Sequence, residues 1–315
     1  MTREDLYYDS RDEITKIHAV RWIPDGKPKA ILQIVHGMQE YAARYEAFAT
    51  YMAEQGYLVI ANDHLGHGLS ATKETYGYFC HHDAATVLVR DVHRLKKNTQ
   101  QEYPNIPIFI MGHSMGSFIL RNYLFMYGSG IQGAIILGTG LMPGTITRFG
   151  RFFCNVLKLF GRDQKPSAFI NKCGFGHYCD RIESPRTSMD WLTVSERNVD
   201  AYLADELCGI PFTVNGYHTL FTLVGRAQNR KAIRNMRKDL PILIFSGGQD
   251  PVGHYGADPR RLYEMFRAQG MDRTELCIFP EARHEVLNED DPAPAYKKVY
   301  DWVESAILDN KAKMI

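Results

Sequence analysis

The sequence lacks the features that mark membrane proteins, secreted proteins and nucleic-acid-binding proteins. None of the apolar runs in its 315 residues is long enough to span a bilayer. The charged N-terminal stretch MTREDLYYDSRDEITK lacks the apolar core of a secretory signal. Charge is nearly balanced, with 37 basic and 36 acidic residues, whereas a nucleic-acid-binding domain would show clustered basic residues. We therefore expect a cytoplasmic globular protein, and the sequence gives no indication of its oligomeric state.

The six cysteines form no Cys-x-x-Cys pair, and a cytosolic chain would keep their thiols reduced. Cys173, His177 and Cys179 are residues of the types that bind zinc. Their spacing matches no standard zinc site, and a fourth ligand is missing. We therefore expect no metal and no other cofactor.

Short apolar runs alternate with helical segments along most of the chain. Strands are expected at residues 14–22, 30–35, 57–61, 108–111, 133–137, 241–245 and 275–279. Helices are expected at residues 45–55, 83–102, 117–127, 259–269 and 294–308. Runs of branched apolar residues suit strands that are buried on both faces. The alternation therefore predicts an α/β protein with a mostly parallel central sheet flanked by helices.

The segment 141–239 interrupts this alternation. Connections in α/β units usually have roughly 2–6 residues, so we expect residues 1–140 and 240–315 to form the core and 141–239 to form an inserted helical cap. Apolar residues recur at helical spacing from Ile146 to Phe160. Two compatible interpretations remain open: a helix packed over the core, or a cap whose apolar face meets a greasy substrate or makes transient contact with a membrane surface.

The five residues Gly112-His113-Ser114-Met115-Gly116 lie between a predicted strand and a predicted helix. In such a G-x-S-x-G turn the serine is the nucleophile, and small neighbours are needed because the backbone turns sharply. Gly112 and Gly116 supply that space. Amides at the start of the following helix can stabilise an oxyanion. We therefore predict that Ser114 is the nucleophile.

A serine nucleophile needs a histidine base, and the base needs an acid to orient it. Asp250 follows the predicted strand 241–245, and His284 follows the predicted strand 275–279. Both residues lie beyond the carboxyl end of a strand, where open α/β sheets build their sites. The sequence therefore predicts a catalytic triad of Ser114, Asp250 and His284.

Three other residues compete for these roles. His254 is also downstream of the serine, but it shares the loop of Asp250 and would leave the last strand without a role. Asp239 and Asp258 are the rival acids, and we interpret Asp258 as the N-cap of the helix that begins near Pro259.

A second oxyanion donor is expected just after strand 30–35, where the chain continues as His-Gly-Met. We assign the two donors to the backbone amides of Met38 and Met115, with Gly37 supporting the turn. A tight glycine turn without that role is the alternative.

The segment NDHLGHGLS contains two further histidines, His64 and His67. Both precede the serine, and clusters of Asn, Asp and Gly chiefly build turns. We interpret both histidines as structural.

The segments HGMQEYAARYEAFATYMAEQGYLVIANDHLGHGLS and GHSMGS resemble the monoacylglycerol lipase and bacterial lysophospholipase branch of the α/β-hydrolases, close relatives of the serine aminopeptidases. The resemblance covers about residues 28–140 and 240–308. It implies the α/β-hydrolase fold, and the later GGQDPV and ARHE segments fit the family's acid and histidine loops at Asp250 and His284. Ser117 departs from the pattern, because many members have a second glycine there.

The resemblance implies hydrolysis of acyl esters, often of lipids with a single acyl chain, beneath a mobile cap. We therefore predict a serine carboxylic-ester hydrolase with a small-molecule acyl ester or lipid as substrate and no nucleic-acid partner. The alternatives are an aminopeptidase of the proline iminopeptidase kind, a carbon–carbon bond hydrolase or acyltransferase, and a non-catalytic binding protein. An aminopeptidase needs a cap carboxylate for the free amino terminus, for which the candidates are Glu183, Asp190, Glu196, Asp200, Asp205 and Glu206.

Overall fold

The computed structural model describes residues 1–312, and within them eight strands form a single sheet. The strands are β1 (Thr2–Asp9), β2 (Lys16–Ile23), β3 (Ala30–Val35), β4 (Tyr57–Asn62), β5 (Ile108–His113), β6 (Gly133–Leu137), β7 (Ile242–Gly247) and β8 (Thr274–Phe279). Their order across the sheet is β1-β2-β4-β3-β5-β6-β7-β8. β2 pairs antiparallel with both β1 and β4, and every other pairing is parallel. The predicted mostly parallel sheet is confirmed.

The burial of the strands follows their composition. The five strands β3 to β7 are buried along their whole length, as expected for branched apolar runs in a parallel sheet. The sequence analysis missed β1. Its sequence TREDLYYD is mostly charged or exposed, and it forms the edge of the sheet, where one side of the strand has no partner strand.

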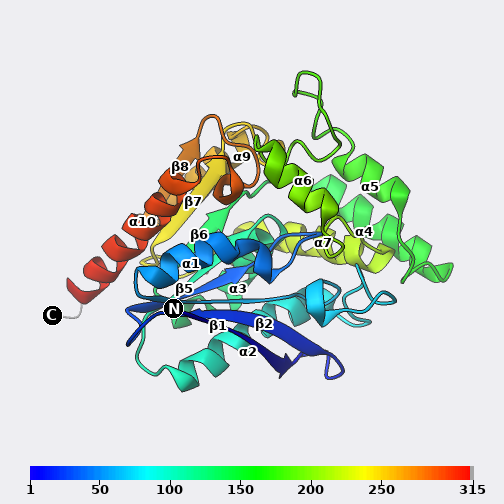
Figure 1. The fold of residues 1–315 in the computed structure, drawn as a ribbon. Coiled ribbons are helices and arrows are strands. Elements are labelled where there is room, and N and C mark those ends of the chain that lie inside the picture. The colour runs from blue at the N-terminus through cyan, green and yellow to red at the C-terminus, as the bar shows by residue number, and fades with distance from the viewer. Residues whose placement is uncertain (313–315) are drawn as a thin grey trace.

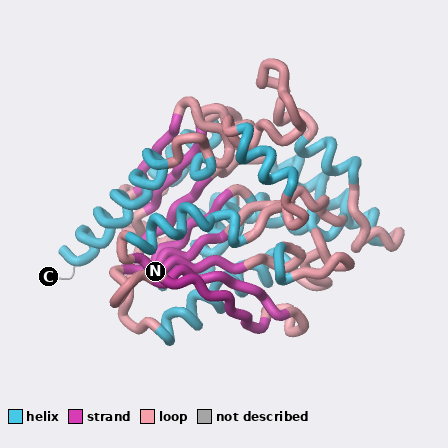
Figure 2. Tube along the Cα trace, in the orientation of Figure 1, coloured by secondary structure: helices cyan, strands magenta, loops and turns pink. Residues whose placement is uncertain are grey.

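Helices cover both faces of the sheet (Figures 1 and 2). They are α1 (Glu46–Glu54), α2 (Ala84–Glu102), α3 (Met115–Tyr127), α9 (Ala257–Arg267) and α10 (Ala293–Ala312). Residues of α2, α3 and α9 belong to one buried apolar cluster, and residues of α1 and α10 belong to a second one. The sheet therefore lies between two apolar layers, which fixes the loops at the carboxyl ends of its parallel strands.

The chain between β6 and β7 contains helices and loops but no strand of the sheet. They are α4 (Gly144–Leu159), α5 (Ala168–Phe175), α6 (Glu196–Ala204), α7 (Val214–Ala227) and α8 (Arg230–Arg234). Figure 1 shows α4, α5, α6 and α7 gathered at one end of the sheet. The predicted division into core and cap stays a prediction, but the helices lie where a cap would be placed. Within residues 1–312 no helix combines the length and the hydropathy that a bilayer crossing requires.

Candidate active site

Ser114 lies at a sharp turn between β5 and α3. Its backbone has a φ of 53° and a ψ of −119°, an unusual conformation for a residue with a side chain. The glycines on either side allow close packing at the turn. A Cβ on Gly112 would collide with the carbonyl oxygen of Gly116, and a Cβ on Gly116 would collide with that of Val35. The turn therefore presents the half-buried Ser114 at the start of a helix.

The backbone amides of Met38 and Met115, which the sequence analysis assigned as oxyanion donors, lie near Ser114. Met115 is the first residue of α3, so its amide has no acceptor within the helix. Met38 follows β3 in the loop that begins at His36 and Gly37, and it lines the same cavity as Ser114. The Gly37 amide is already engaged, because it donates to Glu40 Oε1 at 2.5 Å. Met38 and Met115 are therefore kept as the proposed donors.

Asp250 and His284 meet beside this turn. Asp250 follows β7, His284 follows β8, and both are buried. The His284 Nδ1 atom lies 3.0 Å from Asp250 Oδ1, which also accepts a hydrogen bond from the Val252 amide at 2.9 Å. His284 and Ser114 line one cavity. The three residues proposed as the triad are thus brought to one place by three separate loops.

The rival acids do not line this cavity, and the rival histidine lines it but is paired with an acid of its own loop region. His254 is mostly exposed, and its Nδ1 atom lies 2.7 Å from Asp258 Oδ2. Asp258 was predicted to be an N-cap, and that prediction is wrong. α9 begins at Ala257 with Gly256 as its N-cap, and Asp258 accepts a hydrogen bond from the distant Leu141 amide at 2.8 Å. A tertiary contact thus uses the carboxylate that the local pattern assigned to the helix end.

The remaining acid and the two early histidines have other surroundings. Asp239 is exposed and pairs with Arg237 at 2.8 Å. His64 and His67 are buried behind the loop of His36, whose Nε2 atom accepts from the His64 amide at 2.9 Å. These contacts fit structural roles for both histidines.

A cavity of about 560 Å³ opens above Ser114. Its walls come from the loop after β3, the start of α3, and the helices α4, α5 and α7. Most of the lining is apolar, as in Leu141, Ile146, Phe149 and Phe153. Most small-molecule sites combine such an apolar lining with a few polar groups.

The cap carboxylates do not line this cavity. Asp190 accepts hydrogen bonds from the backbone and side chain of Thr187, and Asp205 accepts one from Tyr41 at 2.7 Å. Glu196 and Asp200 both pair with Arg186. Glu183 and Glu206 are also absent from the lining. Within residues 1–312, the cavity therefore offers no cap carboxylate to a free amino terminus.

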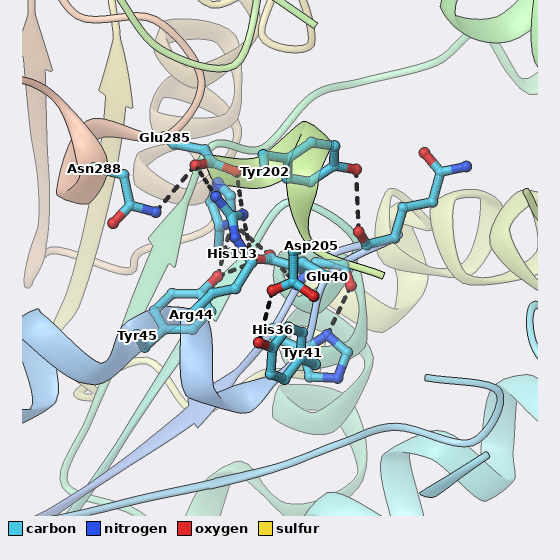
Figure 3. A network of polar contacts seen from close by, with 12 residues as sticks. His36, Glu40, Tyr41, Arg44, Tyr45, His113, Tyr202, Asp205, Glu285 and Asn288 are labelled. Carbon is cyan, nitrogen blue, oxygen red and sulfur yellow. Dashed lines mark hydrogen bonds and ion pairs between the residues drawn. The ribbon is translucent and has the colours of Figure 1, made fainter. Parts of the chain in front are cut away.

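Glu40 lies at the centre of a buried polar network beside the turn (Figure 3). Its Oε1 atom accepts hydrogen bonds from the Gly37 amide and from the Tyr45 hydroxyl at 2.9 Å. The same oxygen lies 3.1 Å from His113 Nδ1, and Oε2 lies 3.2 Å from Arg44 Nη1. Burial alone would raise the pKa of Glu40, but the contacts with His113 and Arg44 hold it well below its usual range.

Arg44 extends the network to the loop of the proposed base. Its guanidinium binds both oxygens of Glu285 at 2.5 and 2.8 Å, and Glu285 directly follows His284. Asn288 donates a further hydrogen bond to Glu285 at 3.0 Å. Burial would raise the pKa of Glu285, and the charge of Arg44 lowers it. The buried network therefore joins the oxyanion loop to the histidine loop.

The oxyanion loop, which follows β3, also contacts α6 of the predicted cap. The Tyr202 hydroxyl donates to the Gln39 carbonyl at 3.1 Å, and the Arg44 guanidinium lies 4.9 Å from the centre of the Tyr202 ring. Tyr41 donates to Asp205 just beyond the helix (Figure 3). A movement of α6 would therefore shift the loop that carries Met38, the proposed oxyanion donor.

His113 is surrounded by acceptors on both sides of its ring. Its Nδ1 atom faces the Glu40 carboxylate, and its Nε2 atom lies 3.3 Å from the His284 carbonyl oxygen, which can only accept. The Nδ1 atom also lies 2.9 Å from the Tyr45 hydroxyl, which donates to Glu40, so a ring with a proton on each nitrogen satisfies both acceptors. Burial alone would lower the pKa of His113, but the hydrogen bond and charge of Glu40 outweigh it and raise that pKa. With His113 cationic, it and Arg44 balance Glu40 and Glu285.

We expect the stabilising contribution of His113 to decline as the pH rises. Its folded pKa is raised, so the contribution is complete below the unfolded pKa of about 6.5 and is lost as the pH passes through the folded pKa. Urea unfolding at a series of pH values should show a free-energy difference between wild type and His113→Gln that shrinks above about pH 6.5.

His93→Gln is the matched control for that experiment. Burial and nearby Lys96 lower the pKa of His93 to about 4, so His93 is neutral in both states well above pH 6.5. Its free-energy difference should then be constant with pH. A constant difference for His113→Gln as well would show that His113 is not held as a cation.

The sequence analysis did not identify this network. The segments that it quoted contain Glu40, Arg44, His113 and Glu285, but it gave none of the four a role. Two members of the network could have been found from their positions next to the predicted triad, because His113 precedes Ser114 and Glu285 follows His284. Glu40 was recognisable as a charged residue in the loop that was assigned an oxyanion donor, because a charge buried beside such a site needs a partner.

The fold and the residues gathered at the turn after β5 define a serine hydrolase of the α/β-hydrolase class. The chain belongs to the family described as serine aminopeptidase, S33, whose model matches residues 26–291.

Curated relatives and solved structures agree with this assignment. Monoglyceride lipase of Rattus norvegicus is 37% identical over 290 residues, which are 91% of this chain and 86% of that protein. The alignment with Homo sapiens monoglyceride lipase is 40% identical but covers only 31% of each chain. A thermostable carboxyl esterase from Bacillus coagulans, solved with glycerol, is 27% identical with a TM-score of 0.86 over 99% of both chains.

Proposed function

We propose that the protein hydrolyses esters of a single long acyl chain, with monoacylglycerols as the substrate class. The observation that carries this proposal is the apolar cavity of about 560 Å³ into whose wall Ser114 and His284 are built. One such cavity suits one acyl chain. The names of the rat and human relatives support a monoacylglycerol in particular.

The charged residues of the lining support a neutral head group. No lysine or arginine of the described chain lines the cavity, and the charge of His113 in its wall is already paired with Glu40, so the phosphate of a lysophospholipid would find no unpaired lysine or arginine there. The two carboxylates that line it, Glu40 and Glu285, are already paired with Arg44. A substrate with a free amino group therefore finds no unpaired acid, which argues against an aminopeptidase.

In the proposed reaction His284 removes the proton from Ser114 as the hydroxyl attacks the ester carbonyl. Asp250 orients the His284 ring and stabilises the imidazolium that forms. The amides of Met38 and Met115 donate hydrogen bonds to the oxyanion, each worth on the order of 3 kcal/mol in the rate. His284 then protonates the departing glycerol, and water attacks the acyl-enzyme by the same route.

The exposed surface of α4 and α5 supports contact with lipid. Phe149, Phe152 and Phe169 are each about two-thirds exposed, at 69%, 65% and 65%. Phe149 and Phe169 also line the cavity. An apolar surface that continues into the cavity would let an acyl chain move from a membrane or micelle into the site with little exposure to water.

The test is turnover of a matched panel: a monoacylglycerol, a lysophospholipid of the same chain, and an aminoacyl amide. We expect the monoacylglycerol to have the highest kcat/KM. A higher kcat/KM for the lysophospholipid would contradict the proposed neutral head group. Turnover of the amide without turnover of the esters would establish the peptidase.

We expect kcat/KM to rise with acyl length in a series of p-nitrophenyl esters. Burial of each methylene contributes about 0.8 kcal/mol, or roughly a fourfold increase, until the cavity is filled. The increase should then level off. Background hydrolysis is measured in parallel with Ser114→Ala. A preference for acetate over longer esters would contradict the assignment of the cavity to the acyl chain.

A further inference from the structure

A second cavity, of about 130 Å³, is built from other faces of α4 and α7. It shares no lining residue with the cavity above Ser114. Its third wall is the segment from Cys80 to Ala85, which leads into α2. The cavity therefore lies where the helices between β6 and β7 meet the rest of the protein.

Three cationic side chains line this second cavity: Arg151 and Lys158 from α4 and Arg226 from α7. Lys158 pairs with Asp163 at 3.1 Å, and Arg226 pairs with Asp83 at 3.0 Å. Arg151 has no ion pair within residues 1–312. The three cations thus have two carboxylate partners, of which only Asp83 lines the cavity, and this leaves an excess of positive charge at a small, partly enclosed site.

His218 on α7 also lines the second cavity, and the nearby positive charges shift its pKa. Burial, followed by the charges of Lys158 and Arg151, lowers the pKa of His218 to about 4, and the charge of Asp163 opposes the shift. Arg226 adds to the lowering. No hydrogen bond to the His218 ring occurs among the described residues. The His218 imidazole is therefore held neutral beside the N–H donors of Arg151, which have no ion pair among the described residues.

We propose that this cavity is a binding site for an oxyanion of the phosphate class, separate from the active site. Arginine presents a fork of N–H donors that matches phosphate oxygens, and charge-assisted hydrogen bonds of this kind are strong. Arg151 supplies a fork that has no ion pair among the described residues, while Lys158 and Arg226 add charge. A bound dianion would favour the protonated form of His218, which then becomes a fourth donor.

An oxyanion at this position would connect three elements. Arg226 already joins α7 to the start of α2 through Asp83 and through Thr86, to which it donates at 2.9 Å. A ligand shared by Arg151 and Arg226 would add α4 to the same junction. Because α4 and α7 also form walls of the cavity above Ser114, the occupied site would hold that cavity in one shape.

The test is calorimetric titration of the full chain with inorganic phosphate at constant ionic strength, in a buffer free of oxyanions. We expect saturable binding, weakened roughly tenfold by Arg151→Gln through loss of charge-assisted hydrogen bonds. Arg148→Gln is the matched control, because it removes the same charge from an exposed position on the same helix outside the cavity. Absence of saturable binding, or equal weakening by the two variants, would overturn the proposal.

The His218 ring provides a second readout that non-specific attraction does not move. In an NMR titration, saturating phosphate should raise the pKa of His218 from about 4 toward its ordinary value of about 6.5. Arg151→Gln should reduce the effect of phosphate. A pKa that phosphate leaves unchanged would place the anion elsewhere and end the proposal.

A last comparison identifies the source of the phosphate group. Glycerol 3-phosphate and soluble dihexanoyl phosphatidic acid are titrated into Ser114→Ala and into Ser114→Ala with Arg151→Gln. Tighter binding of the phosphatidic acid that depends on Arg151 identifies a lipid head group, and equal Arg151-dependent binding identifies a soluble phosphate ester. Binding of both compounds that is independent of Arg151 would refute the site.

Discussion

Replacing Ser114 by alanine is expected to lower kcat for ester hydrolysis by about 10⁶-fold, to the level that binding and the oxyanion donors alone sustain. The reason is that no acyl-enzyme can form without the hydroxyl. The cavity and the Met38 and Met115 amides are unchanged by the substitution, so KM or product affinity should change little. Burst and steady-state kinetics on a p-nitrophenyl ester measure the loss.

Ser117→Ala is the matched control for this experiment. Ser117 lies in the first turn of α3, where its hydroxyl donates to the Ser114 carbonyl at 2.6 Å and lies 2.8 Å from the Thr139 hydroxyl. Its loss removes two hydrogen bonds but no reacting group, so we expect a small effect on kcat. An organophosphorus inhibitor should label Ser114 in wild type and in Ser117→Ala. Retention of more than about 1% of the activity by Ser114→Ala would assign the nucleophile elsewhere.

The core was predictable from the sequence because its signals are local. Strands such as β3 and β7 are continuous apolar runs, and the glycines around Ser114 mark a turn that tolerates no Cβ. The order of Ser114, Asp250 and His284 along the chain then placed three loops at one edge of the sheet. In the structure these loops lie close together, and the catalytic roles of the three residues stay a prediction.

The errors arose where tertiary contacts decide the structure. Asp258 before a proline looks like a helix cap, yet its carboxylate receives the Leu141 amide from 117 positions away. β1 is a charged edge strand without an apolar run, and its backbone pairing with β2 holds it in the sheet. Arg44 and Glu285 are 241 positions apart, so no pattern in the sequence could have paired them.

Replacing Arg44 by methionine is expected to reduce the free energy of unfolding by roughly 3–5 kcal/mol, the usual cost of leaving a buried charge without its partner. In the native protein, cationic Arg44 and His113 balance Glu40 and Glu285. Arg44→Met leaves Glu285 buried and without the guanidinium that pairs with both of its oxygens. Urea unfolding monitored by two probes measures the loss and tests for a single transition. Arg3→Met is the control, because Arg3 pairs with Asp5 and Glu46 at the exposed surface, where such pairs contribute about 0–1 kcal/mol.

A double variant separates the loss of charge from the loss of packing. Arg44→Met with Glu285→Gln removes one charge of each sign and leaves Glu40 and His113 as a balanced pair. We expect it to recover a substantial part of the stability lost in Arg44→Met, because the uncompensated carboxylate is gone. If the double variant is as unstable as the sum of the two single variants, the guanidinium acts through its contact with the Tyr202 ring rather than through its charge. The network would then hold the oxyanion loop by packing, and the pH dependence expected of His113 would have to arise from Glu40 alone.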